Sequence, residues 1–156
     1  MLITESLLRA YAQSCYEALI DGVWQDADRA ALPGDPALPV ALISADNPAS
    51  VAQSESANAE RRAALLAMVV EAGHPWLPAR GRAADASWIE PGLLLRAPLA
   101  HIDACAQHFG QHAVWRPKGA QPKATLRIYS RFGGALPPPL FANVELEWVG
   151  FAAPIP

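Results

Sequence analysis

The arrangement of hydrophobic and polar residues predicts a strand followed by a long helix near the middle of the chain. Residues 37–45 (ALPVALISA) form an apolar run that stops at the Asn-Pro dipeptide 47–48, as a buried strand does. The next segment, SESANAERRAALLAMVVEAG, has helical spacing. Ser54 or Ser56 suits the start of this helix, and Gly73 stands where a terminating glycine belongs.

The same alternation continues further along the chain. Residues 74–81 and 87–97 predict two strands joined by a polar turn, residues 98–110 predict a second helix, and residues 111–117 predict another strand. From residue 37 to 117 the order is β-α-β-β-α-β, which is the order of the ferredoxin-like split βαβ unit. We therefore expect an α+β fold in which helices cover one face of a mainly antiparallel sheet.

The N-terminal segment predicts an additional helix and strand. Residues 4–15 have helical spacing, with Thr4 or Ser6 as the cap. Residues 16–20 predict a strand that ends in an Asp-Gly turn, and residues 25–36 predict a loop because they are rich in turn residues.

The C-terminal segment predicts two further strands. Residues 124–132 and 141–150 alternate apolar and polar positions, so we expect them to pair as a hairpin that extends the sheet. The intervening prolines at 137–139 favour a stiff hairpin loop over a polyproline ligand for a partner. Residues 1–156 are expected to form a single domain.

Composition narrows the class of protein. A chain of 156 residues with 52% hydrophobic and 17% charged residues can fold into a substantial core. A net charge of −3 argues against a nucleic-acid partner, and no apolar run reaches the roughly 20 residues that span a bilayer. The two cysteines do not form a disulfide framework, and the first residues do not resemble a secretory signal. We expect a cytoplasmic protein without membrane or nucleic-acid partners.

The stretch HIDACAQHFGQH is a candidate metal site. His101, Cys105 and His108 stack along one side of the predicted helix, at the margin of its apolar face. Gly110 is expected to end the helix before His112, and ligands stacked on one straight helix converge poorly on a tetrahedral ion. The prediction is therefore two exposed histidines beside a half-buried cysteine, with no metal and no other cofactor.

Polar residues around the predicted strand-to-helix loop form a candidate ligand site. Such loops often hold ligands, because free N–H groups and the helix dipole favour anions there. Asn58 and Arg62 project to the inward side of the long helix, with Arg61 beside them. They either line a pocket or bond the loop and reach past the core to solvent. Glu90 either faces solvent or pairs with one of the two arginines.

Several short boxes resemble the bacterial domain of unknown function 3293 family. The boxes are ISADNP, SESANAER, WIEPGLLL and HFGQHAVW, and the similarity covers about residues 8–117. Ser44 stands for the family's threonine, Asp46 replaces an aromatic residue, and Ala57 replaces a glutamate. The residues that match the family's boxes are Asn47, Asn58, Arg61, Trp88, Glu90, Gly110 and Gln111. The resemblance implies one folded unit with a shared polar constellation, and it names no reaction.

These observations leave three functions open. The first is a binding domain for a small anionic or nucleotide-like ligand, with Arg61 supplying charge. The candidate ligand-binding residues are Ser44, Asn47, Asn58, Arg61, Glu90 and Gln111. The second is a regulatory or protein-interaction domain in which the polar boxes are purely architectural. The third is an enzyme that uses Glu90 as an acid or base in a desolvated site. Oligomeric state is not readable from the sequence.

Overall fold

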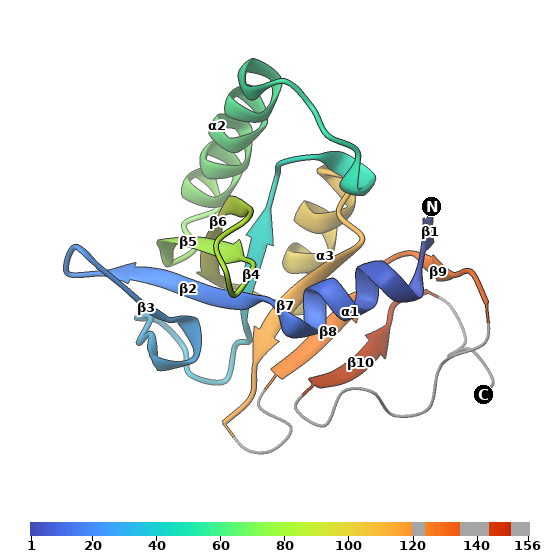
Figure 1. Ribbon diagram of the computed structural model, residues 1–156. Helices are drawn as coiled ribbons and strands as arrows, with labels where there is room; N and C mark the ends of the chain where they lie inside the picture. The colour runs from blue at the N-terminus through green and yellow to red at the C-terminus, as the bar shows by residue number, and fades with distance from the viewer. Residues whose placement is uncertain (120–123, 135–143, 151–156) are drawn as a thin grey trace.

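The computed structural model describes residues 1–119, 124–134 and 144–150, and it has the predicted α+β class with a mainly antiparallel sheet (Figure 1). The described strands form an eight-stranded sheet in the order β10-β8-β7-β4-β6-β5-β2-β3. Their bounds are β2 (Cys15–Ile20), β3 (Val23–Asp26), β4 (Val40–Ser44), β5 (Trp76–Arg82), β6 (Ile89–Arg96), β7 (Ala113–Pro117), β8 (Ala124–Ile128) and β10 (Val144–Trp148). A separate parallel pair joins β1 (Leu2–Ile3) to β9 (Arg131–Phe132).

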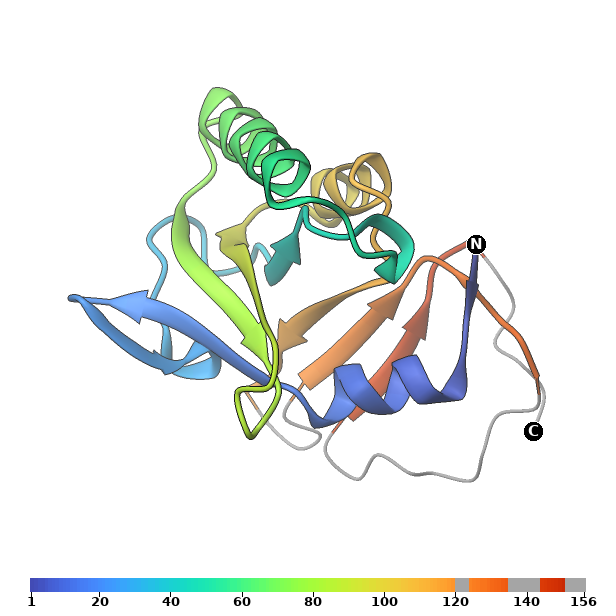
Figure 2. The ribbon, with the colours of Figure 1, turned by 45° about the horizontal axis from the view of Figure 1, so that its top comes forward.

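Helices lie on both faces of the sheet, which corrects the expectation of one covered face. Helices α2 (Glu55–Glu71) and α3 (Leu99–His108) share one side, and α1 (Glu5–Gln13) lies on the other (Figure 2). The central strand β4 is apolar in both directions, as a strand covered on both faces must be. Its Ile43 joins the core beneath α2 and α3, whereas Leu42 joins a second core beneath α1.

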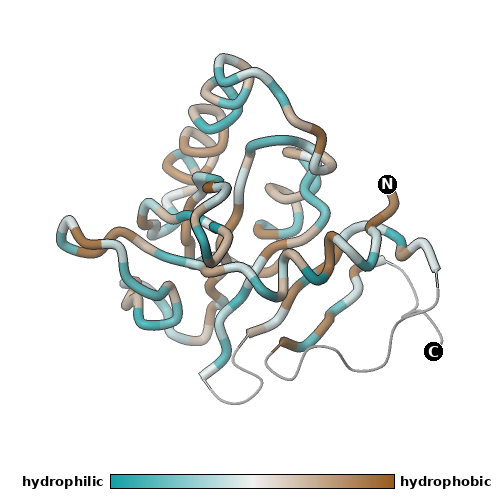
Figure 3. The backbone as a smooth tube through the Cα atoms, in the orientation of Figure 1, coloured by the Kyte–Doolittle hydropathy of each residue, from teal (hydrophilic) through white to brown (hydrophobic). Residues whose placement is uncertain are grey.

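Helix α2 follows the sequence prediction closely. The Ser54 side chain accepts a hydrogen bond from the backbone N–H of Ala57 at 3.1 Å, and Gly73 adopts a positive φ of 74° just beyond the helix. Figure 3 shows the hydrophilic residues gathered in its first turns and the hydrophobic residues in its last turns. Leu65 and Val69 in the second half are buried in the core, so the first half is left to carry polar contacts.

The segment predicted as loop at 25–36 begins inside a strand. Asp21 and Gly22 both have positive φ, and this turn folds β3 back onto β2 as an antiparallel hairpin. Strand β3 is the last strand at its edge of the described sheet, and its Val23 and Trp24 are exposed. Because an edge strand has no strict inside and outside, the period-two pattern that would have predicted it is absent. The 3₁₀ turn η1 (Ala27–Arg29) follows.

The predicted C-terminal hairpin is wrong. Strand β10 pairs with β8 in parallel, with Val144 opposite Ala124 and Trp148 opposite Ile128. Alternation along 124–132 and 141–150 predicted strands but carries no information on their relative direction. The chain leaves the sheet after Ile128 to form β9, and the predicted proline loop lies outside the described residues.

No helix within the described ranges combines the length and the apolar character needed to cross a lipid bilayer.

Candidate ligand-binding cavity

A cavity of about 380 Å³ lies on the α1 face of the sheet, which is within the size range of small-molecule sites. Its floor comes from three neighbouring strands. Leu42 on β4 lies opposite Trp115 on β7, and Trp115 lies opposite Leu126 on β8. Helix α1 contributes Leu7, Ala10 and Tyr11 to the wall. The strand register therefore sets an apolar floor, and the helix closes part of the opening.

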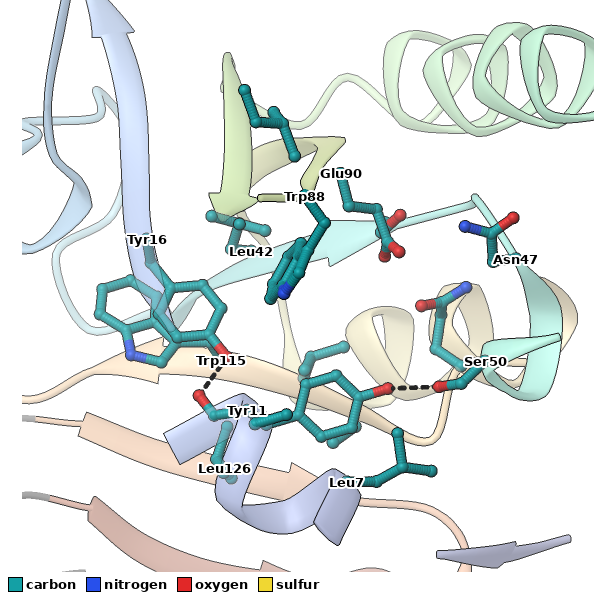
Figure 4. Close-up of a pocket in the computed structure, with 17 residues that line it drawn as sticks. Leu7, Tyr11, Tyr16, Leu42, Asn47, Ser50, Trp88, Glu90, Trp115 and Leu126 are labelled. Atoms are coloured by element: carbon teal, nitrogen blue, oxygen red, sulfur yellow. Dashed lines mark hydrogen bonds between the residues drawn. The ribbon is translucent and has the colours of Figure 1, made fainter. Parts of the chain in front are cut away.

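Four aromatic side chains line the cavity (Figure 4). The ring of Tyr16 stacks on that of Trp115 at a centroid distance of 4.9 Å, and its hydroxyl donates to the backbone oxygen of Tyr11 at 2.6 Å. Burial raises the pKa of Tyr16, so this hydroxyl stays protonated. The Tyr11 hydroxyl is 3.0 Å from that of Ser50. The fourth ring, Trp88, is 41% exposed and comes from the turn between β5 and β6.

Glu90 is the one charged side chain in the described lining of the cavity. Strand register places Tyr16, Gly81 and Glu90 in one row across β2, β5 and β6. The Glu90 carboxylate lies between Trp88 and Asn47 (Figure 4). Burial raises the pKa of this carboxyl above its ordinary range, while hydrogen bonds from Ser44 and Asn47 act in the opposite direction.

Gln111 contributes an amide to the same cavity. Its Nε2 atom donates to the backbone oxygens of Asp46 at 3.1 Å and Phe109 at 3.3 Å. Both partners are carbonyl oxygens, so the amide nitrogen must face them. The amide oxygen is therefore the group that Gln111 can offer to a ligand.

The spacing of β4 and β6 fixes where Glu90 stands relative to Ser44. Gly92 on β6 lies opposite Ser44 on β4. A Cβ atom added at Gly92 would lie 2.5 Å from the backbone oxygen of Ile43, far inside van der Waals contact. Glycine at this position therefore permits the close approach of the two strands beside the cavity.

Asn58 holds the loop after β4. Asn47 has a left-handed backbone (φ 46°, ψ 63°), which asparagine tolerates better than most residues. Its N–H donates to the Asn58 Oδ1 atom at 3.0 Å, and its own Oδ1 atom accepts from Asn58 Nδ2 and from the Gln53 N–H, each at 3.0 Å. These bonds consume the Asn58 amide. The Asn47 amide nitrogen lies on the side of Glu90 (Figure 4).

Arg61 is bonded to the backbone and does not line the cavity. Its Nε atom donates to the Ala45 oxygen at 2.8 Å, and its Nη2 atom donates to the Phe109 oxygen at 2.7 Å. The guanidinium thereby ties α2 to the end of β4 and to the end of α3. Of the six candidate residues, Ser44, Asn47, Glu90 and Gln111 line the cavity, and Asn58 and Arg61 lie outside it.

Arg62 pairs with Asp46 and Glu55 instead of Glu90. Its Nη1 atom lies 2.6 Å from Asp46 Oδ2, and its Nη2 atom contacts Glu55 Oε1. Burial raises the pKa of Asp46 despite this ion pair, and no hydrogen-bond partner reaches its buried Oδ1 atom within the described residues. Asp46, which replaces the family's aromatic residue, is therefore paired with Arg62 and does not line the cavity.

The histidines and the cysteine of the stretch HIDACAQHFGQH lie in different surroundings and do not converge. The Nδ1 atom of His101 lies 3.0 Å from Nε2 of His74, and His108 is exposed, whereas Cys105 is buried. His112 lies beyond α3, buried, with its Nδ1 atom 2.6 Å from the Ser130 hydroxyl. In the part of the chain that the structure describes, no three His, Cys, Asp or Glu side chains gather as a metal site.

Sequence reasoning missed the aromatic wall of the site. The apolar side of α1, with Leu7 and Tyr11, was visible as helical spacing, but spacing does not tell which part of a sheet a helix covers. Trp88 was singled out only as a family match. A pocket made by α1, several strands of the sheet and two loops far apart in the sequence has no signature in a linear pattern.

The fold and the cavity define an α+β protein with a small aromatic-lined site that contains one acid, built by the β4–β7 region together with α1, β2 and β8. Residues 43–114, which run from β4 into β7, match the family model described as "Protein of unknown function (DUF3293)". The match supports, over this part of the chain, the family that the boxes predicted for about residues 8–117. Neither curated proteins nor solved structures gave a match.

Proposed function

We propose that the protein is a small-molecule binding domain whose ligand occupies the cavity beneath α1. One observation carries this proposal: the carboxylate of Glu90 and the amide of Gln111, from different elements, border the same aromatic-lined cavity. A concave apolar site with a few convergent polar groups is the usual form of a ligand pocket.

The unfavourable free energy of removing Glu90 from water supports a role in ligand binding over a purely structural role. An acid that loses water without gaining a basic partner destabilises the folded state. Glu17 shows the structural alternative, since Arg80 and Arg82 contact its carboxylate at 2.9 and 2.7 Å and its pKa is lowered. Glu90 has neither feature, which is common at sites that bind ligands.

The bonding of Arg61 changes the expected charge of the ligand. The sequence prediction of an anionic or nucleotide-like ligand relied on this guanidinium, which instead holds two backbone oxygens. The described lining contains no Lys, Arg or His. The proposal therefore keeps a small ligand and does not require an anion.

A cavity-blocking variant tests the proposal. Ala10 is an exposed residue of α1 that lines the cavity, so Ala10→Trp places a bulky side chain at the site without entering the core. Ala64→Trp is the matched control, because Ala64 is an exposed residue of α2 on the opposite face. The measurement is a screen of low-molecular-weight anionic, neutral and cationic compounds by thermal shift, followed by ligand-observed NMR.

We expect at least one compound to bind the unmodified protein and Ala64→Trp but not Ala10→Trp. A screen in which nothing binds, or in which every ligand binds Ala10→Trp equally well, would reject the cavity as a ligand site. Ligands that bind Ala10→Trp equally well would favour a domain whose polar boxes are architectural. The bonding of Asn58 and Arg61 supports that role for those two residues.

We also propose that β4–β7 form a ferredoxin-like unit. The strand order β7-β4-β6-β5 supports this, because β6 lies between β4 and β5 as in a split βαβ unit. A crystal structure with β6 in any other place would contradict the assignment.

A further inference from the structure

We propose that the ligand of this cavity is a small organic cation, a protonated amine carried on a flat apolar or aromatic body. This inference rests on the proposed function and specifies its ligand class. The geometry that carries it is one carboxylate, the side-chain amide of Gln111 and four aromatic rings around a single cavity.

The charge of the site favours a cation. Glu90 is negative when ionised, and the described lining holds no basic side chain to neutralise it. The nearest arginines on α2 are bonded elsewhere, Arg61 to the Ala45 and Phe109 oxygens and Arg62 to Asp46 and Glu55. A ligand anion would therefore meet an unscreened like charge, whereas a ligand cation would supply the missing partner.

The other hydrogen-bonding groups of the cavity suit a ligand that donates hydrogen bonds. The Ser44 oxygen accepts from the Asp46 N–H at 3.0 Å, so its hydroxyl hydrogen is available to hold the Glu90 carboxylate. The Asn47 oxygen is likewise occupied, and its amide nitrogen lies on the side of Glu90 (Figure 4). Ser44 and Asn47 thus offer donor groups beside Glu90, and Glu90 with the Gln111 oxygen would present acceptors to a group such as an ammonium.

The aromatic walls suit both parts of such a ligand. Trp88 and Tyr11 stand on different sides of the cavity (Figure 4). The faces of such rings attract cations and stack with flat apolar groups. The floor of Leu42, Trp115 and Leu126 provides the surface against which the rest of the ligand packs.

Three probes with the same body and different charge test the inference: 2-phenylethylamine, 2-phenylethanol and 3-phenylpropionate. Calorimetric titration should show the amine binding at least about tenfold more tightly than the alcohol or the acid, the range expected for a charge-assisted hydrogen bond. Glu90→Gln should remove this preference for the amine. Glu60→Gln, which removes an exposed charge from α2, should retain it.

A second readout follows from proton linkage. A cation beside Glu90 favours the ionised carboxylate, so binding should release protons at pH values where Glu90 is partly protonated. Titrations in buffers with different ionisation heats should detect this release in the unmodified protein and in Glu60→Gln but not in Glu90→Gln. Equal or tighter binding of the alcohol or the acid would overturn the inference.

The two experiments distinguish failure of this inference from failure of the proposed function. If the broader screen yields ligands blocked by Ala10→Trp while 2-phenylethylamine does not bind, the cavity remains a ligand site and the aromatic amine is rejected. If the screen yields no ligand blocked by Ala10→Trp, the proposed function itself fails.

Discussion

Two neighbouring polar regions, both built from the family's boxes, differ in how their hydrogen bonds are used. In the first, which we term the closed cluster, Asn58 and Arg61 donate to groups of the protein: Asn58 to Asn47, and Arg61 to the Ala45 and Phe109 oxygens. In the second, the cavity, Glu90 and Gln111 border open space, where the proposed ligand would meet their acceptor atoms. Asn47 belongs to both regions, since its oxygen is bonded in the closed cluster and its side chain also lines the cavity.

Under the proposed function, this contrast separates residues that support the loop from residues that would contact the ligand. Residues that match the same family can hold a loop in a left-handed conformation or face the cavity that this loop helps to form. A variant in the closed cluster should therefore change stability strongly, whereas one in the cavity should change stability little or in the opposite direction.

The largest effect is expected for Arg61→Ala. Removing the guanidinium takes one donor from the Ala45 oxygen and one from the Phe109 oxygen, which keeps only its longer bond from Gln111. This should lower the free energy of unfolding by about 3 kcal/mol. Urea unfolding at neutral pH measures this. Arg9→Ala is the control, because Arg9 forms an exposed pair with Glu5 and should cost less than about 0.5 kcal/mol. Similar small losses for both variants would contradict a supporting role for Arg61.

Asn58→Ala should have the next largest effect. It removes one acceptor and one donor from the Asn47 loop, and we expect a loss of about 2 kcal/mol in the same unfolding measurement. Gln13→Ala, an exposed change at the end of α1, should leave the midpoint nearly unchanged. An Asn58→Ala protein as stable as this control would show that the loop holds its shape without the closed cluster.

Glu90→Gln should act in the opposite direction. Because the folded state raises the pKa of Glu90, its ionised form destabilises the protein above that pKa, and the penalty disappears as pH falls below the unfolded value near 4. The variant should therefore melt about 2–4 °C higher at pH 7, with the difference lost near pH 3. Thermal unfolding at several pH values measures this, and a lower melting temperature at pH 7 would exclude a desolvated acid.

The smallest effect on stability is expected for Trp88→Ala. The indole is 41% exposed at the cavity, so its loss should change the free energy of unfolding by less than about 0.5 kcal/mol. Trp115→Ala, at 9% exposure in the floor, should lose about 3 kcal/mol. Chemical unfolding of the two variants distinguishes a tryptophan at the rim of the cavity from one in its floor. Equal losses would show that Trp88 is part of the core.

The sequence predicted the elements from β4 to β7 well, because Val40–Ser44 and the α2 segment carry strong local signals: a β-branched apolar run, a serine cap and a terminating glycine. It also selected Glu90 and Gln111, which the fold brings to one cavity from separate strands and turns. It did not predict the partner of Arg61, because a side-chain bond to the Phe109 oxygen depends on how α3 packs. The parallel pairing of β8 with β10 was missed for a similar reason, since period-two alternation does not encode strand direction.

Gly92 links the backbone of the sheet to the chemistry of the cavity. Any other residue at this position would force β6 away from Ile43, and Glu90 would move with the strand relative to Ser44 and Asn47. The orientation of the acid is thus encoded partly by a missing methyl group two residues away. Attempts to retune the site by protein engineering have room at Trp88, on the exposed side, but none at this contact between two backbones.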